Sequence, residues 1–206
     1  MKKIISIVLG IFIIAGVVIF YVASSKKNTE PKYMPCPVLE EGETMDVVLP
    51  EYLHQGSAAI SMVPYMKNEG RCVDAWVNDN GELVVKLDQE TLEKNYNIFY
   101  DNLMKEINCK ETNVKEEVSY DYTKLTFYVN DNATLDEFLL SMMVTPGNCY
   151  ALQLLHGIPD EEAVVEVVVI YEPTGKEILI IDEKTHINLN REDWAKLLES
   201  GRNLSE

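Results

Sequence analysis

The chain has 206 residues, with 18 basic and 34 acidic side chains and a formal net charge of −16. That length accommodates one domain of ordinary size plus a targeting segment, and a content of 47% apolar residues excludes disorder by composition. The first 27 residues hold four lysines and no acid, so the other 179 residues carry a net charge of −20. A surface of that sign repels phosphate backbones, so we expect no nucleic-acid partner.

A long apolar run near the N-terminus predicts a membrane anchor over residues 1–27. The nineteen residues from Ile4 to Val22 contain no charged side chain. As a helix they span about 28 Å, close to the ~30 Å hydrocarbon core of a bilayer. A secretory signal usually has a shorter apolar region, so we favour an uncleaved anchor. The small residues Ala23-Ser24-Ser25 keep open the alternative of cleavage and secretion.

The expected topology places the C-terminal domain outside the cytoplasm. Lysine pairs flank the apolar run on both sides, and only three residues precede it. The flanking charges therefore give little orientation signal, and the short N-terminal stub favours an N-terminus that stays inside.

Residues 28–43 are predicted to be a tether, because three prolines stiffen the segment and its glutamates keep it solvated. Residues 44–206 are predicted to form a single domain. Within it, residues 45–49 resemble a strand and 50–53 the start of a short helix, but glycine and proline interrupt both patterns up to residue 70.

Alternating apolar residues on both sides of an Asp-Asn-Gly turn predict a hairpin. A two-residue turn would mix apolar and polar side chains on each face. A three-residue loop with the glycine in the left-handed conformation pairs Val77 with Leu83. The same register pairs Ala75 with Val85 and keeps one face apolar.

The rest of the chain alternates predicted helices and strands. Helices are expected over 88–108, from a capping box at Thr134 and Glu137, and after an Asn190 cap. Pro146-Gly147 is expected to end or kink the second of these helices, with a further helical stretch from Asn148. Strands are expected over 114–129, divided into a hairpin near 120–124, over 163–171, and over 178–181, with Glu172 paired to Lys176.

The resulting order, β-β-α-β(β)-α-β-β-α, predicts an α+β fold. The alternation in most strands favours an antiparallel sheet with helices mainly on one face. If 114–129 forms two strands, the centre is compatible with a ferredoxin-like core. This fold class fixes no function.

Four cysteines, Cys36, Cys72, Cys109 and Cys149, are the first candidates for chemistry. Their spacing contains no Cys-x-x-Cys, which argues against a zinc ribbon or a redox dithiol. Outside the cytoplasm an even number of cysteines permits up to two disulfides, and free buried thiols are the alternative.

Cys149 suggests a weak catalytic alternative. It follows the Pro-Gly break at an expected helix start, where a thiol pKa is lowered, and His186 is a conceivable base. Cys149 also shares a helix face with His156, which indicates packing instead. The three histidines stand alone, and no metal-ligand spacing or cofactor motif occurs, so we expect neither a metal nor a cofactor.

One surface candidate remains. In the predicted hairpin register, Trp76 and Val84 point away from the apolar face, and Tyr128 is expected on the same outer side. An outward aromatic cluster can dock a protein or a sugar, although we expect other parts of the chain to cover it. The sequence therefore predicts a non-catalytic, membrane-anchored, extracytoplasmic binding or assembly module; the alternative is a cell-surface thiol hydrolase that uses Cys149.

Overall fold

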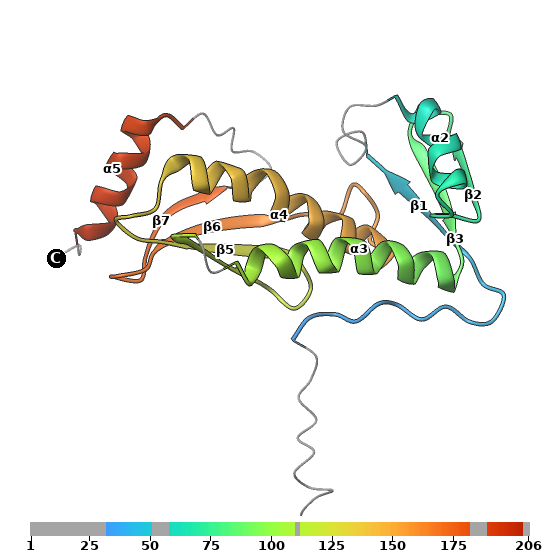
Figure 1. Ribbon diagram of the computed structural model, residues 1–206, viewed down its shortest axis with the longest axis horizontal. Helices are drawn as coiled ribbons and strands as arrows, with labels where there is room; N and C mark the ends of the chain where they lie inside the picture. Colours follow the sequence, from blue (N-terminus) through green and yellow to red (C-terminus); the bar gives the residue numbers. More distant parts are fainter. Residues whose placement is uncertain (1–31, 51–57, 110–111, 182–188, 204–206) are drawn as a thin grey trace, which may run out of the picture. The chain divides into compact units, whose positions relative to one another are not determined.

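The computed structural model describes residues 32–50, 58–109, 112–181 and 189–203 (Figure 1). The predicted anchor, His54 and His186 lie outside the described residues. The chain divides into two units, Met1–Lys32 and Tyr33–Glu206, and the helices and strands of the described residues belong to the second.

The described residues form seven strands and four helices, which confirms the α+β class. The strands are β1 (Met45–Leu49), β2 (Asp74–Val77), β3 (Leu83–Leu87), β4 (Val114–Val118), β5 (Lys124–Val129), β6 (Glu166–Tyr171) and β7 (Lys176–Ile181). The helices are α2 (Ala59–Asn68), α3 (Gln89–Ile107), α4 (Leu135–Leu155) and α5 (Arg191–Arg202). The sequence predicted each of them apart from α2.

The strands form two sheets instead of the single antiparallel sheet that was predicted. The first has the order β1-β3-β2 and is antiparallel, and the second has the order β4-β5-β6-β7. Strands β5 and β6 run parallel, so α4 serves as the crossover between them. A ferredoxin-like core would insert β3 between β5 and β6. That prediction is wrong, because β5 bonds directly to β6 and β3 belongs to the other sheet.

The predicted register of the β2–β3 hairpin is confirmed. Val77 lies opposite Leu83 and Ala75 lies opposite Val85, as predicted, and Gly81 has a φ of +84°. The Asn78 side chain accepts hydrogen bonds from the backbone N–H groups of Asn80 and Glu82, at 3.0 and 2.9 Å. These bonds stabilise the predicted three-residue loop, the loop length that keeps the apolar residues on a single face.

The β6–β7 hairpin differs from its prediction near the turn. Lys176 pairs with Tyr171 instead of Glu172, and a bulge follows at Val169 and Ile170. Beyond the bulge, Val169 pairs with Leu179, which is the predicted register. One extra residue in the turn is therefore absorbed by the bulge before the buried part of the strand begins.

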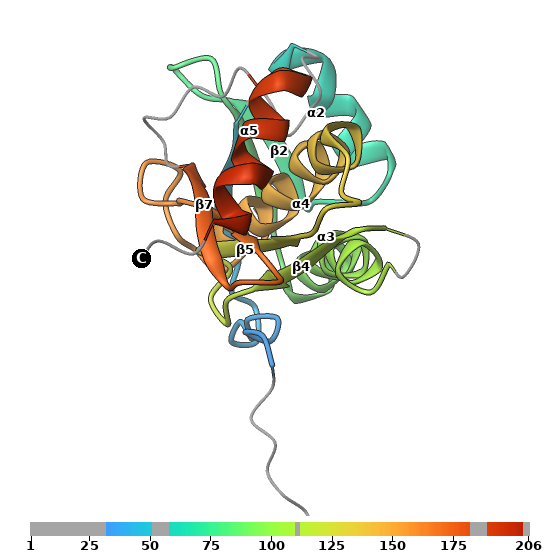
Figure 2. The same cartoon turned by 90° about the vertical axis from the view of Figure 1, so that its left-hand side faces the viewer.

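One face of the second sheet carries the core. Along β5, Leu125, Phe127 and Val129 are fully buried, and the residues between them are not. Phe127 meets Phe138 of α4 edge-on, and Phe138 stacks on Trp194 of α5 with ring centres 4.9 Å apart. Helices α4 and α5 therefore cover the same face, with α5 beside the N-terminal half of α4 (Figure 2).

Helix α4 continues through Pro146, so the predicted end at this position is wrong and the stretch from Asn148 belongs to the same helix. Its capping box is confirmed: Thr134 and Glu137 exchange side-chain bonds with each other's backbone N–H groups. Proline removes one helical hydrogen bond, but Thr145 and Cys149 on either side are fully buried, and their packing holds the helix together. Among the described residues, α4 is the helix long and apolar enough to cross a bilayer, yet 56% of its most apolar window is buried in this domain.

Candidate functional site

The predicted surface of three residues is only partly assembled. Trp76 and Val84 are paired across β2 and β3 as predicted, but Val84 is only 5% exposed and Trp76 is half-buried. The Lys86 ammonium group lies 5.7 Å from the centre of the Trp76 ring. Tyr128 belongs to the other sheet, where its hydroxyl donates to Glu117 at 2.9 Å. The structure therefore provides no common aromatic platform on one sheet.

Cys149 does not sit at a helix start. It lies deep within α4 and is fully buried, and burial together with the nearby Glu116 carboxylate raises the pKa of its thiol to about 12. Burial also raises the pKa of the Cys36 thiol to about 11. All four cysteines are among the described residues and all are free thiols, with Cys109 exposed. The raised pKa values of Cys36 and Cys149 oppose formation of a reactive thiolate at either residue.

His156 occupies the C-cap of α4, and Gly157 follows with a φ of +78°. Its ring packs against Tyr96 and Tyr122, each 6.0 Å away between ring centres. Burial lowers the pKa of His156. The residue therefore contributes a neutral ring to an aromatic cluster instead of a charge at the helix end.

The same aromatic cluster binds Tyr33 and Met34, where the domain begins. The hydroxyl groups of Tyr96 and Tyr122 both donate to the carbonyl of Met34, at 2.6 and 2.8 Å. The Met34 N–H donates to the carbonyl of Tyr120 at 2.9 Å. Tyr33 is buried and stacks on Tyr122. Residues 33 onward therefore belong to the folded domain, which begins earlier than the predicted boundary at residue 44.

Removing both hydroxyl groups, by Tyr96→Phe and Tyr122→Phe, should loosen this docked segment by about 1 kcal/mol for each bond lost. Faster amide hydrogen exchange at Met34 would show it. Tyr120→Phe is the matched control, because the Tyr120 ring is half-exposed and only its backbone carbonyl holds Met34. Equal exchange rates in the double variant and the control would contradict this account of the docking.

A polar cluster lies where β4 meets α4. Thr145 is fully buried, and its hydroxyl donates to the Glu116 carboxylate at 2.7 Å. Ser141 also bonds this carboxylate, and Asn148 follows on the same helix face. Burial raises the pKa of Glu116 although the two hydroxyls act against that rise. The helical spacing of Ser141, Thr145 and Asn148 is the signal in the sequence that indicates this polar cluster.

This cluster predicts a pH dependence of stability. A carboxyl group whose pKa is raised by folding binds more protons in the folded state, so stability falls as pH rises from about 4.3 through the raised value. Glu116→Gln should therefore stabilise the domain at pH 7, and its advantage should shrink as pH falls toward 4. Urea unfolding at several pH values measures this. A constant difference between Glu116→Gln and wild type at every pH would contradict it.

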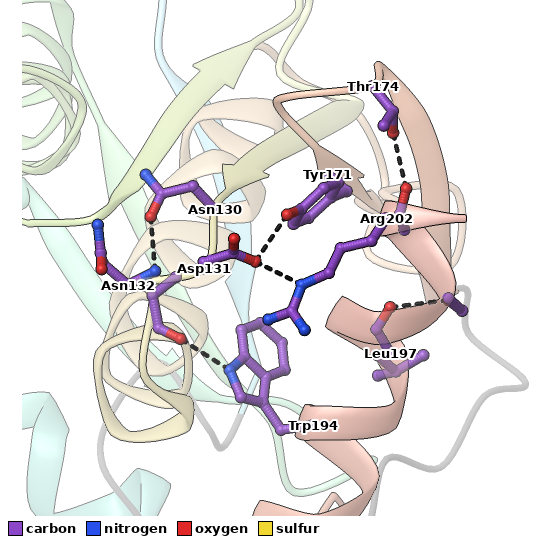
Figure 3. Close-up of polar contacts among 11 residues, drawn as sticks. Asn130, Asp131, Asn132, Tyr171, Thr174, Trp194, Leu197 and Arg202 are labelled. Carbon is purple, nitrogen blue, oxygen red and sulfur yellow. Dashed lines mark hydrogen bonds and ion pairs between the residues drawn. The ribbon is translucent and has the colours of Figure 1, made fainter. Parts of the chain in front are cut away.

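A second polar network fastens α5 to the rest of the domain (Figure 3). The Asp131 carboxylate accepts from the Tyr171 hydroxyl at 2.6 Å and from Arg202 Nε at 2.8 Å, and these two groups lower its pKa. Trp194 Nε1 donates to the carbonyl of Ala133 at 2.9 Å. The bonds of Arg202 and Trp194 join α5 to the segment between β5 and α4, which indicates a structural role.

The exposed face of α4 is the strongest candidate for a binding site. Leu139, Leu140 and Met143 are 38%, 65% and 81% exposed. The sequence has no charged side chain from Phe138 to Leu155. The exposed side of a surface helix normally carries charged residues, and apolar groups gathered on one exposed face mark interaction sites.

Two further findings bear on function. Among the described ranges, no group of three or more histidine, cysteine, aspartate or glutamate side chains could hold a metal ion. The chain matches no protein family model, no curated protein and no solved structure.

Proposed function

We propose that the chain is a single-pass membrane protein whose acidic α+β domain works outside the cytoplasm as a non-catalytic binding or assembly module. The apolar run Ile4–Val22 supports attachment, because its length and lack of charge suit a bilayer-spanning helix.

The binding role is carried by one observation, the exposed apolar face of α4. Leu140 and Met143 lie on the helix that also supplies the core residues Phe138 and Thr145, so the face is presented on a rigid element. Its side chains are aliphatic or thioether groups, whereas sugar rings stack on aromatic ones. A protein partner therefore fits this surface better than a glycan, and the acidic domain does not suit a nucleic acid.

Cell fractionation tests the attachment. We expect the intact 206-residue chain in the membrane pellet after alkaline carbonate extraction. The alternative, a secreted protein, would appear in the medium at a lower mass, shortened by cleavage after Ala23-Ser24-Ser25. Either a soluble intact chain or a shortened one would overturn the membrane anchor.

The alternative of a thiol hydrolase needs a reactive Cys149, and the geometry offers none. In the folded protein we expect a small thiol reagent to modify the exposed Cys109 readily and to leave Cys149 unmodified. Peptide mass spectrometry after a short reaction measures this. Rapid modification of Cys149 ahead of Cys109 would favour the hydrolase.

A further inference from the structure

We infer that the surface formed by Leu139, Leu140 and Met143, the α4 surface, binds an amphipathic helix of a partner protein. The apolar residues of that helix face α4, and lysine or arginine residues surround them. This inference rests on the proposed binding function and names its site and partner.

The geometry of the α4 surface suits a helical partner. The three residues occupy positions i, i+1 and i+4, so they form one continuous strip on successive turns. Partly exposed apolar residues border the strip; they are Met142, Val144 and Pro146. One turn further on, a Cβ atom placed on Gly147 would meet nothing within 4 Å. A partner backbone can therefore approach closely at that end.

The negative charge of the domain favours a positively charged partner. The strip itself is uncharged, but Tyr33–Glu206 has a net charge of −20, since residues 1–32 hold five lysines and one glutamate. A second copy of this chain would bring the same charge, and an anionic membrane would be repelled in the same way. A basic partner gains attraction at no cost to the apolar contact.

The side chains of the α4 surface match this mode of recognition. Methionine is flexible and polarisable, so it adapts to different apolar partners. Amphipathic helices bind apolar surfaces through residues spaced at i, i+3, i+4 and i+7. An acidic domain that exposes Met143 beside two leucines thus presents both the apolar contact and the complementary charge.

The test uses two labelled 18-residue peptides, one with leucines on one helical face and lysines on the other, and one in which glutamates replace the lysines. The full chain is held in phosphatidylcholine nanodiscs, and empty nanodiscs give the background. We expect fluorescence anisotropy to show that the lysine peptide binds at least tenfold more tightly than the glutamate peptide. The double variant Leu140→Asn, Met143→Gln should weaken binding of the lysine peptide at least tenfold.

Ile60→Asn is the matched control, because Ile60 is also an exposed aliphatic residue, 70% exposed, on a different helix. It should change the affinity less than twofold. Equal binding of both peptides, binding no greater than to empty nanodiscs, or equal loss in the control would overturn the inference. So would dimerisation of the full chain that Met143→Gln abolishes. The fractionation experiment tests membrane attachment independently. A failed peptide test would therefore overturn the partner without affecting the conclusion on the anchor.

Discussion

Gly201→Ala should destabilise the domain by about 1–3 kcal/mol, the usual cost of forcing extra volume into a packed site. A Cβ atom on Gly201 would lie 2.5 Å from Cβ of Tyr171 and 2.6 Å from its Cγ. Tyr171 cannot easily yield, because its side chain is buried and its hydroxyl is bonded to Asp131. The added methyl group should therefore push α5 away from β6 and shift the urea midpoint downward.

Gly147→Ala is the matched control, since it makes the same change inside another helix. Nothing lies within 4 Å of its added Cβ atom. Alanine favours a helix interior over glycine by about 0.5–1 kcal/mol, so this variant should be slightly more stable than wild type. If both glycine variants changed stability in the same direction and by the same amount, the close packing of α5 on Tyr171 would be contradicted.

Gln153→Met should cost about 1–3 kcal/mol, because it removes the hydrogen-bond partner of the buried Tyr122 carbonyl and of two partly buried backbone groups of Val164. The Gln153 amide donates to the carbonyls of Tyr122 and Val164 at 3.0 and 2.7 Å, and its oxygen accepts from the Val164 N–H at 3.1 Å. Each buried group left unsatisfied costs about 1–3 kcal/mol. Methionine keeps the shape of the side chain, so the loss measured in urea unfolding reports the polar contacts.

Asn108→Ala provides the comparison, because the Asn108 amide makes one exposed bond, to the carbonyl of Met104 at 2.7 Å. Its loss should change stability by less than about 0.5 kcal/mol, as for most surface substitutions. A Gln153→Met variant as stable as Asn108→Ala would show that the turn at Tyr122 and the start of β6 do not depend on this side chain.

The sequence predicted local structure well where short-range chemistry decides it. The β2–β3 register followed from one turn and one apolar face, and the helix caps at Asp88, Thr134 and Asn190 are all present. Each of these features depends on residues no more than a few positions apart.

Long-range pairing was not predictable in this way. The alternation of apolar residues in β3 and β5 does not indicate which strand pairs with each of them. The sequence therefore predicted one sheet where the domain has two. The continuity of α4 through Pro146 depends on tertiary packing around Thr145 and Cys149, which propensity does not include. The uncharged run from Phe138 to Leu155 also does not indicate which of its apolar residues stay exposed, as Leu140 and Met143 do.

The most direct test of the proposed function is to ask which side of the membrane Cys109 faces. Cys109 is the exposed cysteine of the four, so intact cells can be treated with an impermeant reductant and then with a membrane-impermeant maleimide. We expect labelling in intact cells that is lost in Cys109→Ser. Labelling of Cys109 only after the cells are broken would place the domain in the cytoplasm and contradict the proposed extracytoplasmic role.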